Sequence, residues 1–348
     1  MVGPSFREAA MDRPSYVIWD MTYACPLRCV HCYSESGRRP SLQPSPADME
    51  RIADAIVSLG PDEIAFSGGE PLIVRGVLGL ARRIREAGVR VSLYTSGWTL
   101  TPELAARLVE EFTEVHVSVD GATAATHDRI RGRRGSFARA LGALSMLDEA
   151  AARRPDFVFG VDSVVVCSNI DEVEAVCRDV LPRYPRLAQV LFGAVIPSGL
   201  ASRAGFARLE LLGEEELARL CDPGLAEKLR ALVPGVNVQV TTNRELQMHP
   251  DLIAEGMVFP AMQVEPDGAV RAMPIYEGTV GNLLHEDPGE LWRRSVARWS
   301  DPFVTGALRE ARTWPQWAEA TRRIDERFGS AAVRERIANR PGYPLHAA

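Results

Sequence analysis

Three cysteines lie close together near the start of the chain. Cys25, Cys29 and Cys32 form a CxxxCxxC cluster. Structural zinc sites prefer four ligands, often as two separated CxxC pairs, and cubane iron–sulfur clusters are usually held by four thiolates. Three thiolates would leave one iron open to a ligand that is not protein, which is useful when a cluster must touch a substrate or cofactor. The alternatives are three free cysteines at a core edge, or a small zinc site that also uses His31.

The other three cysteines are scattered, and none follows Cys221. A disulfide scaffold does not fit a chain of this size and expected compartment. We expect Cys177 and Cys221 to be structural. Cys167 ends the fifth predicted strand, on the side where active sites form, so it is a candidate donor of a hydrogen atom. The alternative is a small buried side chain, because free cysteine is among the most buried residue types.

The composition excludes several classes of protein. The chain has 348 residues, of which 46% are hydrophobic and 25% charged, and this is an ordinary globular composition. A net charge of −6 gives no positive field for nucleic acid. No apolar run approaches the roughly 18–20 residues of a membrane span. Residues 1–14 are polar and lack a signal-peptide core, so we expect a cytoplasmic protein that binds neither nucleic acid nor membrane.

Strand-like and helix-like segments alternate over the first two hundred residues. The predicted strands cover 15–22, 63–67, 89–94, 114–119, 157–167 and 189–195. The predicted helices cover 46–59, 78–87, 102–112, 136–153 and 171–181. This alternation is typical of a parallel sheet with helices on its outside. Six units are too few for an eight-fold barrel, so we predict an α/β fold with an open, partial barrel and a site at the carboxyl ends of its strands.

The regular alternation of strand-like and helix-like segments ends after Gly199. Helices are predicted over 213–232, 290–299 and 315–328, a strand over 236–241, and a hairpin over 262–273 around Pro266, Asp267 and Gly268. We therefore expect an N-terminal tail over 1–14, the partial barrel over 15–210 and an α+β extension over 211–348 that packs on the barrel.

Short polar motifs follow several of the predicted strands. Residues 67–71 read Ser-Gly-Gly-Glu-Pro, where two glycines permit close backbone approach to a ligand and a carboxylate can take an ammonium group. Residues 94–97 (Tyr-Thr-Ser-Gly) and 118–121 (Ser-Val-Asp-Gly) follow the next two strands. A local basic cluster comes after them, and it is suited to bidentate carboxylate recognition or to a solvated loop. Its members are Arg129, Arg131, Arg133 and Arg134.

Together these motifs resemble the radical S-adenosylmethionine (SAM) superfamily, which carries CxxxCxxC after the first strand of a partial (β/α)6 barrel. The resemblance implies that Cys25, Cys29 and Cys32 hold a [4Fe–4S] cluster, whose fourth iron is chelated by the amino and carboxylate groups of SAM. In this family one electron from the reduced cluster cleaves SAM to methionine and a 5′-deoxyadenosyl radical, which abstracts hydrogen from the substrate. An aromatic residue often precedes the third cysteine, whereas this chain has His31.

The resemblance also implies which residues contact SAM. The GGEP motif receives the methionine amino group, the turn after the third strand offers hydroxyl or amide groups to the ribose or substrate, and an arginine reaches the SAM carboxylate. The corresponding residues here are Gly68, Gly69, Glu70, Pro71, Thr95, Ser96, Ser118 and Arg131.

The C-terminal part resembles a SPASM segment that lacks its metal ligands. Residues 264–270 match the hairpin of that segment and 280–283 match its closing Gly-Asn-Leu. Met273 stands where a cysteine would follow the hairpin, so a cysteine-ligated auxiliary cluster cannot form there. Without such a cluster we expect a redox-neutral or reductive step, such as decarboxylation or epimerisation. Tyr276, just past the hairpin, is a second candidate hydrogen donor.

The sequence therefore predicts a radical SAM enzyme of natural-product biosynthesis that acts on a small polar substrate such as a sugar, nucleoside or amino-acid derivative. A carboxylated sugar nucleoside would suit the arginine cluster. An external electron donor such as flavodoxin or ferredoxin is expected. One alternative is a maturase that modifies a ribosomally made peptide. Another, from a different class, is a non-catalytic iron–sulfur or zinc protein.

Overall fold

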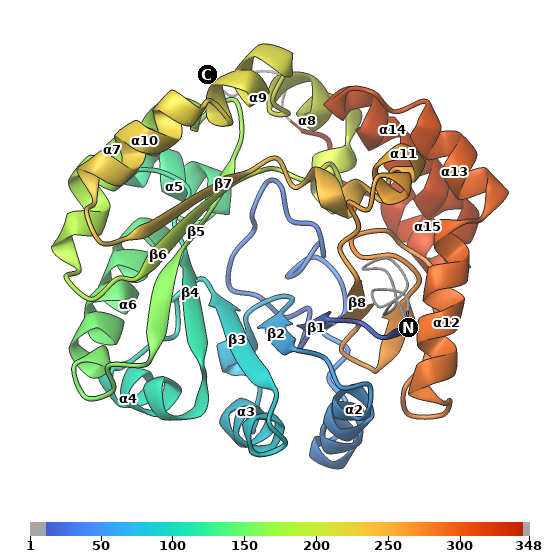
Figure 1. Ribbon diagram of the computed structural model, residues 1–348. Helices are drawn as coiled ribbons and strands as arrows, with labels where there is room; N and C mark the ends of the chain where they lie inside the picture. Colours follow the sequence, from blue (N-terminus) through green and yellow to red (C-terminus); the bar gives the residue numbers. More distant parts are fainter. Residues whose placement is uncertain (1–11, 344–348) are drawn as a thin grey trace, which may run out of the picture.

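The computed structural model describes residues 12–343, whose strands form one curved sheet (Figure 1). The strand order is β10-β9-β8-β1-β2-β3-β4-β5-β6-β7. The parallel strands are β1 (Tyr16–Asp20), β2 (Glu63–Ser67), β3 (Arg90–Thr95), β4 (Glu114–Ser118), β5 (Val158–Val165), β6 (Gln189–Ala194), β7 (Asn237–Thr241) and β8 (Ala261–Val264). Two antiparallel strands, β9 (Ala269–Arg271) and β10 (Thr279–Asn282), complete the edge next to β8. The sheet is an open barrel, as the alternating sequence predicted.

Helices cover the outer face of the parallel strands (Figure 1). In the barrel these are α2 (Pro46–Ser58), α3 (Val77–Glu86), α4 (Pro102–Glu111), α5 (Ala124–Arg131) and α6 (Ser136–Ala151). Next come short α8 (Ala204–Leu209), α9 (Glu214–Leu220), α10 (Pro223–Leu232) and α11 (Pro250–Ala254). The helices beside β8 to β10 are α12 (Pro288–Trp299), α13 (Pro302–Arg309), α14 (Trp314–Phe328) and α15 (Ala331–Ala338). Among the described residues, no helix is both long and apolar enough to cross a membrane.

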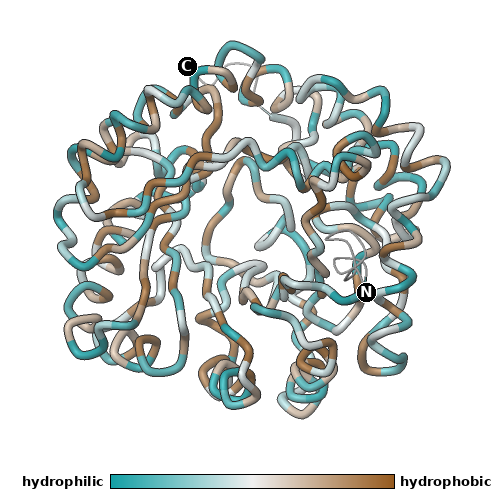
Figure 2. The backbone as a smooth tube through the Cα atoms, viewed as in Figure 1, coloured by the Kyte–Doolittle hydropathy of each residue, from teal (hydrophilic) through white to brown (hydrophobic). Residues whose placement is uncertain are grey.

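The core lies between the sheet and its helices. Every second strand residue points outward under a helix; on β4 these are the fully buried Val115 and Val117. Helix α3 buries one apolar face that includes Leu80 and Ile84. Figure 2 shows apolar segments gathered along the strands, with hydrophilic turns toward the outside. The alternate strand residues face inward, so the inner face of the sheet is free to carry polar side chains.

Some predicted elements differ from the structure. The single helix predicted over 213–232 is two helices, because Pro223 has no backbone N–H and Asp222 caps a new helix at Leu225 N. The helix predicted over 171–181 is a run of short 3-10, α and π turns from Ile170 to Arg183. Helices α5, α8, α11, α13 and α15 and strand β10 were not predicted as elements.

The sheet continues across the boundary expected near residue 210. Strand β7 pairs in parallel with β6, and β8 pairs in parallel with β1. The extension therefore adds strands to both edges of the barrel sheet, which is closer contact than packing alone. Residues 1–11 of the expected tail and residues 344–348 lie outside the described part of the chain.

Candidate active site

A cavity of about 360 Å³ lies inside the curve of the sheet. Its walls include the last residues of β2, β3 and β4, namely Ser67, Thr95 and Ser118. The three clustered cysteines also line it. They belong to the loop between β1 and α2, residues 21–45, here called the cysteine loop. In Figure 1 this blue loop lies within the arc of strands.

The cysteine loop is held by hydrogen bonds to its backbone carbonyls. Arg133 donates to Pro26 O (2.6 Å), Arg203 to Val30 O (2.7 Å), Arg38 to Arg28 O (2.6 Å) and Leu200 N to Cys32 O (3.0 Å). Because the loop has no regular secondary structure of its own, these contacts, one from within the loop and three from the segments after α5 and after β6, fix the positions of the cysteines.

The three thiols are free and line a partly open, mostly apolar space. Burial, together with the neighbouring Cys29, raises the pKa of Cys25 to about 12. Burial likewise raises the pKa of Cys29 to about 11, although the Arg131 guanidinium, whose Nη1 is 4.0 Å from Cys29 Sγ, opposes the shift. Such thiols are poor nucleophiles but good ligands, because iron can replace the protons. The three-thiol donor set therefore fits an iron–sulfur cluster.

His31 contributes a neutral imidazole to the lining of the same cavity. Burial lowers its pKa to about 4, and its Nδ1 is buried without a hydrogen-bond partner in the described structure. Within residues 12–343, no three His, Cys, Asp or Glu side chains converge closely enough to hold a single metal ion. A zinc ion needs ligand atoms about 2.0–2.3 Å away, so the cysteines and His31 do not form a ready zinc site.

The second glycine of the GGEP motif packs against the cysteine loop. A Cβ at Gly69 would lie 2.1 Å from Ala24 O, which is far too close for any side chain. Gly69 N donates to Thr22 O (2.7 Å) and Glu70 N donates to Ala24 O (3.0 Å). The motif therefore fixes the loop as well as lining the cavity, where both Gly68 and Gly69 are exposed to the space.

Glu70 and Pro71 do not line the cavity among the described residues. The Glu70 carboxylate is fully buried and accepts hydrogen bonds from Thr95 Oγ1 (2.7 Å), from Ser96 N (3.0 Å) and from the Ser96 hydroxyl. Burial raises its pKa, while the hydrogen bonds from Ser96 and Thr95 work in the opposite direction. Glu70 thus ties the turn after β2 to the turn after β3, and it is Thr95 and Ser96 that reach the cavity.

Ser118 and Arg131 also line the cavity, from β4 and from the end of α5. Arg131 makes a buried ion pair with Asp120, with Nε–Oδ2 at 2.6 Å and Nη2–Oδ1 at 2.8 Å. Although burial works to raise the pKa of Asp120, the Arg131 guanidinium holds it below the usual value. The guanidinium is therefore fixed between Asp120 and Cys29.

The predicted hydrogen donors lie elsewhere. Neither Cys167 nor Tyr276 is among the described residues that line the cavity. The Cys167 thiol donates to Leu211 O (3.1 Å), and the Tyr276 hydroxyl donates to Gln247 O (2.9 Å) and accepts from Trp317 Nε1 (2.8 Å). Both side chains are held by backbone carbonyls away from the site, so their donor role has no geometric support here.

Most of the arginine cluster does not face the cavity either. Of its four members, only Arg131 is a lining residue in the described structure. Arg133 holds the cysteine loop and stacks on Trp98, 3.7 Å from the ring centre, and Arg129 lies 3.6 Å from Glu210. The carboxylate-binding use suggested for this cluster therefore lacks support, and holding the loop is the role that the contacts show.

Sequence analysis missed several lining residues. Asp162 of β5, Asn243 in the turn after β7 and Gln263 of β8 all line the cavity, beside the hydrogen-bonded pair Tyr16 and Tyr94. Asp162 had a visible signal, because it is a charged residue within an otherwise apolar and small strand sequence. Asn243 and Gln263 come from elements whose place in the sheet was not predicted, whereas Tyr16 and Tyr94 belong to predicted barrel strands but were not proposed as site residues.

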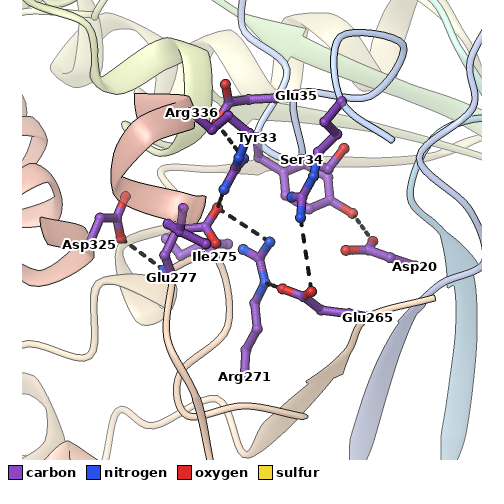
Figure 3. Close-up of polar contacts among 12 residues, drawn as sticks. Asp20, Tyr33, Ser34, Glu35, Glu265, Arg271, Ile275, Glu277, Asp325 and Arg336 are labelled. Atoms are coloured by element: carbon purple, nitrogen blue, oxygen red, sulfur yellow. Dashed lines mark hydrogen bonds and ion pairs between the residues drawn. The ribbon is translucent and has the colours of Figure 1, made fainter. Parts of the chain in front are cut away.

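A buried network of ion pairs lies beside the site, between the hairpin, α14, α15 and the cysteine loop (Figure 3). Arg271 contacts Glu265 (2.9 Å) and Glu277 (3.5 Å), and its side chain is 0% exposed. Arg336 contacts Glu277 and Glu35 (both 2.7 Å). Glu35 lies in the cysteine loop, so the network joins the extension to that loop.

Two further residues complete this network. Asp325 of α14 accepts from Glu277 N (2.8 Å), and Arg340 contacts Glu35 (2.8 Å). Burial and the nearby Glu277 raise the pKa of Asp325 to about 7. Burial works to raise the pKa of Glu277 too, but Arg271 and Arg336 hold it below the usual value. Tyr33 donates to Asp20 (2.5 Å), which is a further link from the loop to the sheet (Figure 3).

Comparison with known proteins gives the family. The model of the Radical SAM superfamily matches residues 19–180. An AdoMet-dependent heme synthase of Methanosarcina barkeri is 35% identical over 47% of this chain and 46% of its own length. Mycofactocin maturase MftC of Mycolicibacterium smegmatis is 35% identical over 48% of this chain and 42% of its own length. The Fe-coproporphyrin III synthase of Methanosarcina barkeri is 30% identical over 81% of this chain and 74% of its own length. The chain thus spans under half the length of the first two relatives.

Solved structures share the fold, including the extension. SuiB of Streptococcus suis bound to S-adenosylmethionine has a TM-score of 0.64 at 15% identity and covers 86% of this chain and 68% of its own. The anSMEcpe enzyme with bound AdoMet has a TM-score of 0.57 at 15% identity and covers 93% of this chain and 99% of its own. With the motif match and the long relative, these results show that the chain belongs to the radical SAM superfamily, with a SPASM-type extension and with a [4Fe–4S] cluster and SAM as cofactors.

Proposed function

We propose that this enzyme cleaves SAM reductively at a single [4Fe–4S] cluster and abstracts hydrogen from a small polar substrate held in the same cavity. The observation that carries the proposal is that the three cysteines, the glycines of the GGEP motif and the Ser96 and Ser118 side chains line one cavity. When bound, the cluster and SAM supply a 5′-deoxyadenosyl radical. The protein supplies position and exclusion of water.

The chain's own residues have separable tasks in this proposal. Cys25, Cys29 and Cys32 hold the cluster, and Gly69 lets the GGEP turn approach the loop that carries them. Glu70 acts as a positioning residue, because it holds Thr95 and Ser96 in place without itself reaching the cavity. Arg131, fixed by Asp120, presents a guanidinium edge for a carboxylate of SAM.

A redox-neutral reaction, such as decarboxylation or epimerisation, is the proposed outcome. Residues 222–348 contain no cysteine, so the extension of this chain offers a single thiol, Cys221, which is too few ligands for a cysteine-ligated auxiliary cluster. A substrate radical must then be resolved by bond scission, by return of a hydrogen atom or by an external reductant. Flavodoxin or ferredoxin is the proposed source of the electron for SAM cleavage.

Anaerobic reconstitution with iron and sulfide tests the proposal. We expect about four irons per chain, a brown protein, and 5′-deoxyadenosine when SAM and dithionite are added. Replacing dithionite by reduced flavodoxin tests the electron donor. About eight irons per chain would contradict the single cluster, and a colourless, zinc-loaded protein that forms no 5′-deoxyadenosine would contradict the enzyme itself.

A ribosomal peptide is the second candidate substrate. It is favoured by the 35% identity to a mycofactocin maturase and by the fold shared with SuiB, which has also been solved with its precursor peptide SuiA. Deuterium transfer separates the two candidates: the compound whose deuterium appears in 5′-deoxyadenosine is the substrate. Transfer from a peptide, with none from deuterated sugar, nucleoside or amino-acid derivatives, would replace the first candidate by the second.

A further inference from the structure

We propose that Asp162 is an acceptor in the cavity for an amino group of the substrate, with Asn243 as a further acceptor on the same cavity wall, so that the substrate carries an amine. This inference rests on the proposed function, because it names what the same cavity binds. It begins from the polar side chains of the cavity that the rest of the protein leaves without partners.

Asp162 carries a carboxylate that faces the cavity. Its residue stands between Ser118 of β4 and Leu191 of β6 in the sheet register, and both neighbours also line the space. Within the described residues, no hydrogen bond or ion pair reaches the Asp162 side chain. The residue is only partly exposed. A carboxylate that is withdrawn from bulk water and has no partner is costly, so its presence indicates a ligand that supplies the partner.

The two side chains that oppose the rise in the Asp162 pKa are already engaged. Arg131 is paired with Asp120, and the His116 Nε2 lies 2.5 Å from Glu114 Oε1. Both side chains act on the Asp162 carboxyl only at longer range, where they oppose the rise in its pKa that burial causes. Among the described lining residues, Arg131 is the only arginine or lysine, so a substrate carboxylate would find no uncommitted cation here.

Asn243 adds a second acceptor. Its Nδ2 donates to Ala194 O (2.8 Å). Because a carbonyl oxygen can only accept, this bond fixes which end of the amide is nitrogen and leaves Oδ1 as the free acceptor. A Cβ at Gly193 would lie 2.8 Å from Asn243 Nδ2, so glycine at this position makes room for the amide. Asn243 also lines the cavity.

Apolar side chains surround these two acceptors. Leu191, Leu246, Phe259 and Ile275 form part of the same wall. Such a site binds an ammonium or N–H group on an aliphatic or aromatic body, because the charged end pairs with the carboxylate while the body displaces water from the apolar wall. Amino-acid derivatives, amino sugars and peptides with a basic side chain all belong to this class.

The test compares three probes that differ only in their polar end: n-pentylamine, n-pentanol and pentanoate. Their dissociation constants are measured by thermal shift with the reconstituted, SAM-bound enzyme, and again with Asp162→Asn, whose iron content and SAM affinity serve as checks on folding. We expect the amine to bind wild type about tenfold more tightly than the alcohol. Asp162→Asn should remove that advantage and leave SAM affinity unchanged. Asn243→Ala should reduce the advantage in part.

Three results would overturn the inference. The amine and the alcohol could bind wild type equally, pentanoate could bind best, or the advantage of the amine could survive in Asp162→Asn. If Asp162→Asn instead weakens SAM tenfold or more, the carboxylate belongs to the SAM ribose and the inference is also wrong. Failure of the proposed function is a separate observation, because wild type would then form no 5′-deoxyadenosine whatever the probes bind.

Discussion

The cavity and the neighbouring ion-pair network are both buried and polar, but they treat their charges in opposite ways. In the network, Arg271, Glu277 and Arg336 contact one another or a further charged residue (Figure 3). In the cavity, the cysteine thiols are unbridged and the Asp162 carboxylate has no described partner. Charges that are already paired contribute to structure, whereas groups left without a partner in a cavity are the ones that await ligands.

The two regions meet in the cysteine loop. Glu35, three positions after Cys32, is held by Arg336 and Arg340 of the C-terminal segment. The network therefore fixes the extension against the cysteine loop. If this contrast is correct, substitutions in the cavity should first reduce the formation of 5′-deoxyadenosine. Substitutions in the network should first lower the free energy of unfolding.

The largest expected effect is from Cys29→Ala. Removing one of three thiolate ligands should abolish formation of 5′-deoxyadenosine and remove most of the bound iron, because an open cluster cannot be held by two thiolates at this loop. Iron analysis and chromatography of the reaction measure both. Cys221→Ala is the matched control, since Cys221 is exposed and should leave both values unchanged. Retained activity in Cys29→Ala would refute its role as a ligand.

Arg271→Met should have the largest effect on stability. It removes the fully buried guanidinium that contacts both Glu265 and Glu277, and breaking a buried ion pair costs about 3–5 kcal/mol in the free energy of unfolding. Urea denaturation measures the loss. Arg293→Met is the control, because that side chain is 70% exposed and its pair with Glu290 should contribute less than about 1 kcal/mol. Equal losses in the two variants would show that the network is not structural.

Gly69→Ala should affect both regions, because it strains the cysteine loop, which contacts the cavity and the ion-pair network. A Cβ 2.1 Å from Ala24 O forces the backbone to move. We expect a loss of about 1–3 kcal/mol in unfolding free energy and weaker SAM binding. Gly79→Ala lies in helix α3 with no atom near its Cβ, so it should be neutral or stabilise by up to about 1 kcal/mol. Unchanged SAM affinity in Gly69→Ala would argue against the role of the close contact.

The smallest expected effect is on the pH dependence of the free energy of unfolding, through Asp325 in the network. Because the pKa of Asp325 is raised to about 7, the folded state holds a proton there that the unfolded state releases near pH 4. Its contribution is therefore fully present below pH 4 and is lost as the pH rises through 7. Asp325→Asn keeps the acceptor for Glu277 N but cannot titrate. The difference in stability between the variant and wild type should grow in favour of the variant by about 1–2 kcal/mol from pH 6 to pH 8. A constant difference would contradict the assignment.

The sequence predicted the barrel strands well because their periodicity is local. Residues 63–67 were predicted and observed as a strand without change, since a short apolar run between turns has few alternatives. The cysteine loop and the glycine turns were found for a similar reason, because each motif lies within a few residues. Where one proline decides the outcome, as at Pro223, a closer reading of the sequence could have divided the helix.

The remaining features depend on contacts between distant segments. No local signal pairs Arg336 with Glu35, which lie 301 positions apart. The same is true of Asn243, which reaches the cavity only because β7 extends the sheet beside β6. Glu70 was predicted to face SAM, but whether a carboxylate points into a cavity or toward Thr95 and Ser96 depends on packing that a motif does not encode.

The pairing of β8 with β1 sets the timing of assembly. Strand β1 starts at Tyr16, but its neighbour on one side starts at Ala261, and the arginine that anchors the cysteine loop is made later still. At about 5–20 residues per second, synthesis of the 301 positions between Glu35 and Arg336 takes about 15–60 s. During that interval the three thiols lack the Arg336 anchor, so cluster insertion is expected to follow the synthesis and docking of α15, which carries Arg336.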